Sequence, residues 1–376
     1  MALLIFFLIL SILILIHEFG HFIVAKKNGI RVEEFGLGLP PRMIGKKLGE
    51  TIYSLNWLPF GGFVRLTGED LEDAAEEDSL SDPRSFASKT ALQRLAVLLA
   101  GVFMNFVLAI VLFYALLIAR DFKSFYVPLL FDYQFKFGNV HKISTVVSGF
   151  GEEAPAERAG VQLGEAIIKI NGVAVNNVDD VRRELSGTLG QPVELEVIDL
   201  KVSSEQKPRF LVAEPYPDES GNAVLGVYLT TAAYLSYDTP VERALSGFLH
   251  GYNVFTYSAS TMADIVVASF RARDIAPVSQ TVAGPVGIYN IVGSILDYAG
   301  ADAFLSLVDY TALMSLSLAF INMLPFPALD GGRAVFILVE VITRRKLNPK
   351  LEARIHRAGM LVLLALLALV TIKDIR

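Results

Sequence analysis

Hydrophobic residues along this chain gather in four long runs, which are separated by stretches where polar and charged residues dominate. The runs extend over Ala2–Ala25, Leu92–Ala119, Phe304–Leu324 and His356–Ile372. An α-helix rises about 1.5 Å per residue, so roughly 20 residues cover the ~30 Å hydrocarbon core of a bilayer. The pattern therefore predicts four transmembrane helices.

Basic residues flank these runs on one side of the predicted membrane. They follow the first and third runs and precede the second and fourth: Lys26, Lys27, Arg31, Arg42, Lys46, Lys47, Lys89, Arg94, Arg344, Arg345, Lys346, Lys350, Arg354 and Arg357. Because cytoplasmic loops carry an excess of Lys and Arg, we expect these loops in the cytosol. Both termini and the stretch Arg120–Ala303 then lie on the opposite side of the membrane, which in a bacterial cell would be the periplasm or outer face.

A fifth apolar segment, Ala244–Phe270, is long enough to span but contains polar residues such as His250, Asn253 and Asp264. A span here would reverse the third run and move its polar end away from His17. Pro240 is typical of a helix start. We interpret the segment as a helix that lies on the outer surface of the membrane, and an inserted helix remains the alternative.

Between the second and third runs the composition becomes that of a small β-rich domain. We expect strands at Val146–Val147, Ala166–Ile170 and Val193–Ile198, a turn at Asn171–Gly172, and a helix Val178–Leu185 capped by Asn177. The segment Pro155–Gly160 followed by Leu163–Gly172 resembles a PDZ domain, with Glu165 where PDZ domains usually carry Asp. A peptide or substrate ectodomain contact through this domain is what the resemblance implies.

Composition adds two restrictions. Of the 376 residues, 53% are hydrophobic, which excludes an ordinary soluble protein and favours an integral membrane protein. The chain contains no cysteine, so any metal ion must be bound by histidine or carboxylate. We expect the lipid bilayer as a partner of so hydrophobic a chain, and no nucleic acid as a partner.

The first hydrophobic run contains the sequence His17-Glu18-Phe19-Gly20-His21, an H-E-x-x-H pattern. Residues four apart share one face of a helix, so both imidazoles can reach one metal ion with Glu18 beside them. Ionisable groups at membrane depth are costly without a partner, and a zinc ion would provide one. The alternatives are two packing histidines or a signal peptide, although this start lacks a basic n-region and a cleavage site. His141, His250 and His356 have no partner at ligand spacing.

A zinc site needs a third protein ligand, and Asp330 is the best candidate. It follows Asn322-Met323-Leu324-Pro325-Phe326-Pro327 at the polar end of the third run, on the same predicted side as His17 and His21. The alternative is that Asp330 caps a helix over Arg333–Val341. The acidic stretch Glu69–Asp82 is interpreted as a solvated cytosolic loop, with a gate or partner site as the alternative.

The pentad and the sequence N-x-x-P-x-P-x-L-D-G-G resemble motifs of the site-2 proteases, which are intramembrane zinc metalloproteases. Gly101–Asn105 and Gly284–Ile288 also resemble family motifs. With one PDZ-like insert, the chain is most similar to the bacterial branch that cleaves anti-sigma factors and remnant signal peptides. The resemblance implies that His17, His21 and Asp330 bind one Zn²⁺, and that Glu18 is the general base and then protonates the leaving amine.

The resemblance also covers substrate binding. Thr51–Leu66, with short β-type runs around Pro59-Phe60-Gly61-Gly62, is similar to the family's membrane-reentrant β-loop, whose edge would add an unwound substrate as a further strand. Asn322 and Asn105 could supply amides to a substrate backbone or an oxyanion. Each could instead satisfy the backbone of a proline-broken helix.

We therefore predict an α-helical polytopic membrane protein with about four transmembrane helices, a membrane-reentrant β-loop and an inserted PDZ-like domain. The expected parts are residues 1–120 and 304–376 as membrane core, 121–235 as PDZ-like domain and 236–303 as surface helices. The expected activity is endopeptidase cleavage within or near the span of a single-span protein that another protease has already trimmed. A silent scaffold, which would need neither Glu18 nor Asp330, and a zinc transporter, which would need polar residues along several spans, are the alternatives.

Overall fold

The computed structural model describes residues 1–69, 82–151, 153–200, 208–274, 282–298, 300–345 and 348–375. The chain divides into two compact units. The first contains residues 1–112, 273–297 and 307–376, and the second contains residues 113–272 and 298–306. The four-part division expected from the sequence stays a prediction.

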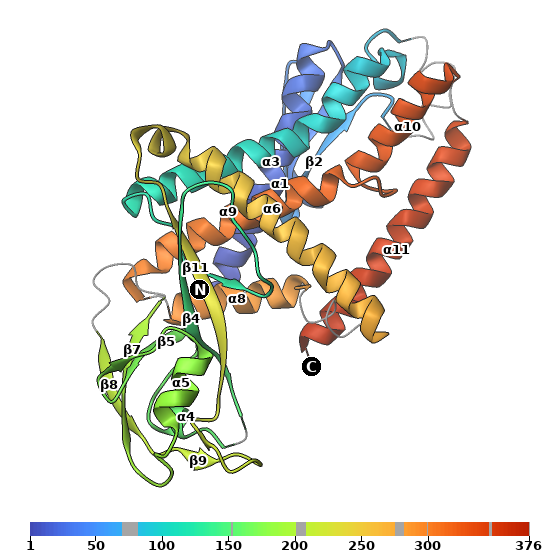
Figure 1. Ribbon diagram of the computed structural model, residues 1–376. Coiled ribbons are helices and arrows are strands. Elements are labelled where there is room, and N and C mark those ends of the chain that lie inside the picture. Colours follow the sequence, from blue (N-terminus) through green and yellow to red (C-terminus); the bar gives the residue numbers. More distant parts are fainter. Residues whose placement is uncertain are drawn as a thin grey trace. The chain divides into compact units, whose positions relative to one another are not determined.

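Long helices form most of the first unit (Figure 1). They are α1 (Ala2–Lys27), α3 (Ala91–Ala119), α8 (Pro285–Tyr298), α9 (Ala303–Met323), α10 (Asp330–Thr343) and α11 (Pro349–Ile375); α3 ends and α9 begins in the second unit. In the described part of the chain, four helices are long and apolar enough to cross a membrane: α1, α3, α9 and α11. The four predicted runs are thereby confirmed as helices. The fourth helix begins earlier than predicted, because the polar residues before His356 continue it.

The helix α1 packs closely against α3 and α8. A side chain on Gly20 would collide with the carbonyl of Ala100 and with Met104, so only glycine permits this approach of α1 to α3. Leu13, two helical turns before Gly20, is buried with Val292 of α8. These contacts hold α1 firmly at the level of the H-E-x-x-H pattern.

A long β-hairpin follows α1. Its strands are β1 (Val32–Leu48) and β2 (Thr51–Leu66), which pair antiparallel with several register shifts. The two short runs predicted around Pro59–Gly62 are therefore wrong in extent, because β2 continues through this segment. β1 was not predicted, since its prolines, glycines and charged residues hide the alternation that marks a strand. The base of the hairpin is buried with Ala25 and Val97, and the 3₁₀ turn η2 (Phe86–Ser88) lies in the same cluster.

The second unit contains an antiparallel sheet with the order β3-β11-β4-β5-β7-β8, and β6 pairs with β5. The strands are β3 (Val127–Leu129), β4 (Asn139–Phe150), β5 (Glu165–Ile170), β6 (Val173–Ala174), β7 (Val193–Asp199), β8 (Arg209–Ala213) and β11 (Val227–Ser236), with a separate pair β9 (Tyr216–Pro217) and β10 (Ala223–Val224). Two short helices accompany them, α4 (Pro155–Arg158) and α5 (Val178–Leu185). We call β4–β8, β11, α4 and α5 the PDZ-like domain.

Local signals in the PDZ-like domain are confirmed. Asn171–Gly172 joins β5 to β6, and Asn177 caps α5 by accepting the N–H of Asp180 at 2.9 Å. Glu165 is 2% exposed and accepts from Arg209 Nη1 at 2.6 Å and from the N–H of Gln162 at 2.8 Å. This glutamate therefore makes a structural ion pair within the domain.

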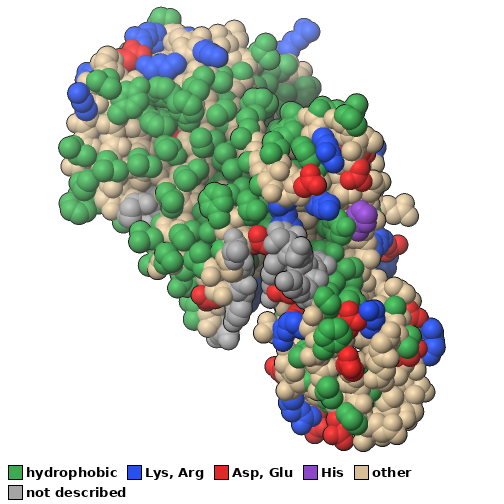
Figure 2. All heavy atoms as spheres, turned by 90° about the vertical axis from the view of Figure 1, so that its left-hand side faces the viewer, with side chains coloured by type: hydrophobic (Ala, Val, Ile, Leu, Met, Phe, Trp, Pro, Cys, Tyr) green, Lys and Arg blue, Asp and Glu red, His purple; other side chains and the backbone are tan. Residues whose placement is uncertain are grey.

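The longest helix of the second unit, α6 (Pro240–Ala272), begins at Pro240 as predicted. Its buried side includes His250 and Asn253, and its other side exposes apolar residues such as Phe248 and Phe270. It is not among the four helices that are apolar enough to span. The 3₁₀ turn η3 (Gly300–Asp302) precedes α9. On the face drawn in the space-filling view, hydrophobic side chains predominate over the helical part. Positively and negatively charged side chains are scattered over the PDZ-like domain (Figure 2).

Candidate metal centre

The two histidines of the H-E-x-x-H pattern lie together on one face of α1. Their Nε2 atoms are 3.1 Å apart, and the residues are only 8% (His17) and 7% (His21) exposed. One helical turn separates them, which is the reason for the shared face. The spacing in the sequence therefore produces the expected pair of imidazole nitrogens.

Asp330 joins this pair from the start of α10. Its Oδ2 atom lies 3.0 Å from His17 Nε2 and 3.5 Å from His21 Nε2. The N-cap of α10 is Leu329, and Asp330 is the first residue inside the helix. No side-chain hydrogen bond caps this helix. The alternative in which Asp330 caps a helix starting near Arg333 is thus wrong.

The three side chains fit a zinc ion. Their ligand atoms all lie within 4.8 Å of one another, and Asp330 Oδ2 has no hydrogen-bond partner among the described residues. A tetrahedral ion bound at about 2.0 Å requires its ligands to stand roughly 3.3 Å apart, which is close to the three distances in the structure. Nitrogen and carboxylate oxygen are also the donor types that zinc accepts in a chain without cysteine.

The second nitrogen of each histidine is held by α3. His21 Nδ1 donates to the carbonyl of Val97 at 2.8 Å, which leaves the lone pair on Nε2. His17 Nδ1 lies 3.4 Å from Asn105 Nδ2, and Asn105 Oδ1 has no partner in the described chain. A half-turn of the Asn105 amide brings Oδ1 to the Nδ1–H of His17 and satisfies both groups.

Gly101 of α3 makes room for the two imidazoles. A Cβ atom at this position would lie 2.5 Å from His21 Nε2 and 2.7 Å from His17 Nε2. Any side chain here would therefore occupy the space in front of both ligand atoms. Sequence reasoning singled out Gly101–Asn105 as a motif but missed this role, and the glycine itself was the available signal.

Glu18 lies beside the metal-ligand cluster and next to the β-hairpin. Its Oε2 atom accepts the backbone N–H of Val64 in β2 at 3.1 Å, and a Cβ on Gly62 would be 3.9 Å from Glu18 Cγ. A Cβ on Gly61 would likewise be 3.7 Å from Ile14 Cδ1. The structure brings Gly61 and Gly62 to the site, whereas the side chains of Pro59 and Phe60 lie outside the described residues.

A cavity of about 210 Å³ opens onto this cluster. Its lining consists of Ile14, His17, Glu18, Asn105, Leu318, Asn322, Ala328, Leu329 and Asp330. Asn105 is fully buried, and its carbonyl accepts from Ser315 Oγ of α9 at 2.8 Å. Asn105 and Asn322 therefore share one cavity with Glu18 and with two of the metal-ligand candidates, His17 and Asp330.

Two expectations near the cluster need revision. His356, for which the sequence showed no partner at ligand spacing, accepts the N–H of Ala328 at its Nδ1 at 2.9 Å. A bond between residues so distant along the chain leaves no periodic signal. Glu69, the first residue of the acidic stretch, accepts from Arg333 Nη1 of α10 at 2.5 Å. Residues 70–81 of that stretch lie outside the described residues.

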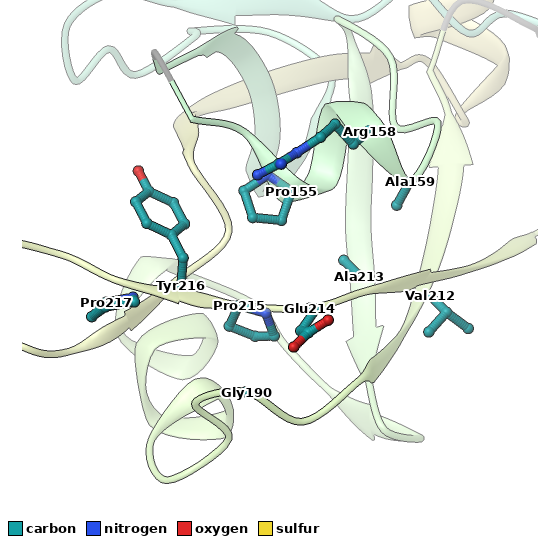
Figure 3. A pocket seen from close by; sticks show the side chains of 10 residues that line it. All are labelled: Pro155, Arg158, Ala159, Gly190, Val212, Ala213, Glu214, Pro215, Tyr216 and Pro217. Atoms are coloured by element: carbon teal, nitrogen blue, oxygen red, sulfur yellow. The ribbon is translucent and has the colours of Figure 1, made fainter.

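The PDZ-like domain has a larger cavity of about 600 Å³, bounded by α4 and by the residues around the end of β8 (Figure 3). Its charged lining consists of Arg158 from α4 and Glu214, which follows β8. None of its lining residues is a histidine. Cavity size therefore does not identify the chemical site, whereas converging lone pairs do.

Known proteins resemble the whole chain. The sequence profile of peptidase family M50 matches residues 5–366. A Clostridium perfringens protein assigned as a zinc metalloprotease is 37% identical, covering 97% of this chain and 96% of the relative. Similarly assigned proteins of Clostridium acetobutylicum and Fusobacterium nucleatum are 32% and 28% identical, covering 97% and 100% of this chain and 94% and 98% of the relatives. Among solved structures, the PDZ domain of an SdrC-like protein from Listeria monocytogenes matches at 16% identity and a TM-score of 0.19, covering 26% of this chain and 93% of that one.

Proposed function

Because the chain belongs to peptidase family M50, the site-2 protease family of intramembrane zinc metalloproteases, we propose that His17, His21 and Asp330 hold its zinc ion. The observation that supports this assignment is the convergence of two Nε2 atoms and one Oδ2 atom beside Glu18. The two histidines and Glu18 belong to α1, which is apolar enough to span. Family membership favours an enzyme over the scaffold and transporter alternatives.

Glu18 is the proton carrier in this proposal. A bound zinc ion supplies a Lewis acid that polarises the scissile carbonyl and acidifies the attacking water. Glu18 takes the proton of that water on its carboxylate and delivers it to the leaving amine nitrogen. Val64 orients the carboxylate through its N–H, while Val97 and Asn105 orient the two imidazoles.

The strand β2 is proposed to bind the substrate in extended form. A helical substrate hides its carbonyls in its own hydrogen bonds, so the span must be unwound before attack. The bond from Val64 to Glu18 supports this role, because it puts the backbone of β2 directly beside the base. We expect that replacing Pro59–Gly62 with a flexible linker raises the KM for a membrane substrate, and unchanged cleavage would contradict the clamp.

The side-chain amides of Asn322 and Asn105 are proposed to hold a substrate carbonyl or the developing oxyanion. Both line the same cavity as Glu18 and Asp330, which supports a role near the scissile bond. We expect Asn322→Ala to lower kcat for cleavage without changing the zinc content. Equal kcat values for the variant and the wild type would leave Asn322 as a purely structural amide.

We propose as substrate a single-span membrane protein of the anti-sigma-factor or remnant-signal-peptide type, after an earlier cleavage has trimmed its outer part. The chain would lie in a bacterial inner membrane with both termini extracytoplasmic, as the flanking basic residues favour. In this arrangement α6 lies on the outer surface, supported by its exposed apolar side chains.

The PDZ-like domain is proposed to contact the substrate's trimmed end or to exclude substrates that are too large. A groove of about 400 Å³ runs between α5 and the start of β11, and its lining includes Val181, Arg182 and Gly226–Leu229. Over Val227–Leu229, β11 pairs with β4. An extended peptide could add to β11 in this groove.

The test is cleavage of a tagged single-span substrate by the purified, zinc-loaded protein, compared with Glu18→Gln. We expect cleavage within the span by the wild type and a loss of roughly 10²–10⁴-fold in the variant, which keeps its zinc. Equal cleavage by both proteins would remove Glu18 from the mechanism. Failure of the wild type to cut any of several trimmed substrates would contradict the proposed activity.

A further inference from the structure

The turn between α9 and α10 delivers Asp330 to the two histidines, and its backbone has an uncommon conformation. Ala328, two residues before Asp330, has a φ of +77°, in the left-handed region that residues with a side chain rarely adopt. Such a conformation persists only where surrounding contacts enforce it. The contacts that enforce it here therefore bear on the position of the Asp330 carboxylate.

His356 of α11 makes one of these contacts. Its Nδ1 atom accepts the N–H of Ala328 at 2.9 Å. To accept at Nδ1, the neutral imidazole carries its proton on Nε2, which faces Glu352 Oε1 at 3.9 Å. The side chain is 11% exposed, and its ring lies 5.2 Å from that of Phe336 in α10. His356 thus contacts both the turn and the helix that Asp330 begins.

A second contact lies one helical turn further along α11. A Cβ on Gly359 would be 2.6 Å from both the Cβ and the carbonyl oxygen of Pro327, so the backbone of α11 lies directly against the turn. Gly359 is the only buried residue of α11 among those whose exposure the structure describes. The other residues of α11 whose exposure is described are half-buried or exposed.

We propose that His356 is a positioning residue for Asp330, acting by accepting the N–H of Ala328 and so fixing the turn that aims the carboxylate at His17 and His21. This inference rests on the proposed role of the three residues as zinc ligands. It gives α11 a function within the metal centre although none of its side chains is a ligand candidate. Without the acceptor, the partly buried N–H of Ala328 loses its partner, and the turn can relax to conformations that move Asp330 away.

The test compares three substitutions in the full-length protein in detergent. His356→Asn places a carbonyl oxygen close to the position of Nδ1, His356→Gln extends its carbonyl toward the position of Nε2, and His356→Leu removes the acceptor at similar bulk. Zinc affinity is measured by competition with a chelator, and cleavage of the model substrate is measured in parallel. Leu361→Ala, at an exposed position of α11, serves as the control.

If His356 acts through its hydrogen bond, zinc affinity falls by roughly 10- to 100-fold in His356→Leu and His356→Gln. His356→Asn and the control should stay within a few-fold of the wild type. A residue that merely fills space would give the opposite order, because Asn loses the ring against Phe336 and Leu keeps most of the volume. If His356→Leu does not fold, the comparison of Asn with Gln still decides.

Equal zinc affinity in the Asn and Gln variants, or in Leu and the wild type, would overturn the inference. That result is distinguishable from failure of the proposed function, because the wild type would then still bind zinc and cleave its substrate. A wild type that binds no zinc would instead contradict the metal centre itself.

Discussion

Two clusters of polar side chains in this protein each contain buried histidine and differ in chemistry. In the first unit, His17 and His21 converge with Asp330, so that three lone pairs meet. In the second unit, His250 is 2% exposed and lies 3.1 Å from the hydroxyl of Tyr237, which also lies 3.4 Å from the amide of Asn253. Neither Tyr237 nor Asn253 carries a carboxylate.

The comparison shows that burial of a histidine does not by itself indicate a metal site. The His250 cluster satisfies its own hydrogen bonds, and burial lowers the pKa of His250 to about 4. The zinc-site candidates leave Asp330 Oδ2 without a partner among the described residues, which is the expected state of a ligand whose partner is an ion. Convergence of unsatisfied acceptors therefore separates a binding site from a packed core.

The largest expected effect distinguishes the two clusters directly. Asp330→Ala or His21→Ala should lower zinc affinity by more than about 100-fold and abolish cleavage, since each removes a proposed ligand. The matched control is His250→Gln, which alters a buried histidine elsewhere and should leave the zinc content at that of the wild type. Zinc per chain, measured by elemental analysis after dialysis, checks both. Loss of zinc in His250→Gln, or its retention in Asp330→Ala, would reverse the assignment of the two clusters.

A smaller effect is expected from the glycine that faces the zinc-site candidates. Gly101→Ala puts a methyl group in the space directly in front of the Nε2 atoms of His21 and His17, so the imidazoles must separate. We expect zinc affinity to fall by about 10-fold or more, as for other changes just outside the ligands. Gly293→Ala in α8 is the control, because a Cβ there meets nothing within 4 Å. Equal affinities for the two variants would show that Gly101 does not shape the site.

The smallest effect concerns the cluster without a metal. His250 is neutral when folded at neutral pH, and its pKa of about 4 lies below the unfolded value of about 6.5. As the pH falls below 6.5, the unfolded chain gains a proton that the folded chain does not bind, so stability is lost until the pH reaches about 4. Between pH 7 and pH 5 the loss from this residue is about 2 kcal/mol.

Thermal unfolding of the purified protein at the two pH values measures this loss. His250→Gln removes the titration and should show a smaller drop in Tm between pH 7 and pH 5, although its Tm at pH 7 is lower because the bond to Tyr237 changes. An identical drop in both proteins would mean that other groups cause the acid sensitivity of the second unit.

Much of the metal centre could be predicted from the sequence, because its signals are local. The spacing of His17 and His21 decides their common face, and the proline and glycine pattern around Asp330 marks a broken helix with an acid at its end. The four spans were readable from length and apolarity alone. Asn177 and the Asn171–Gly172 turn were readable for the same reason, since each depends on a few neighbouring residues.

The remainder depends on contacts between distant segments. The strand β1 pairs with β2 through backbone hydrogen bonds, and the pattern of its side chains does not predict a strand. The contact of Gly101 with the histidines and the bond from Ala328 to His356 arise only when α3 and α11 pack against their neighbours. The hydrophobic periodicity of one segment does not predict which residue of another segment will contact it.

The most direct test of the account is X-ray absorption at the zinc edge of the purified protein, compared with Asp330→Ala. The account predicts one zinc per chain, with nitrogen and oxygen ligands at about 2.0 Å, a scattering signature of two imidazoles and no sulfur. The variant should lose the metal or one oxygen ligand. A protein that binds no zinc, or a zinc environment that is the same in Asp330→Ala, would contradict the claim that His17, His21 and Asp330 form the metal centre.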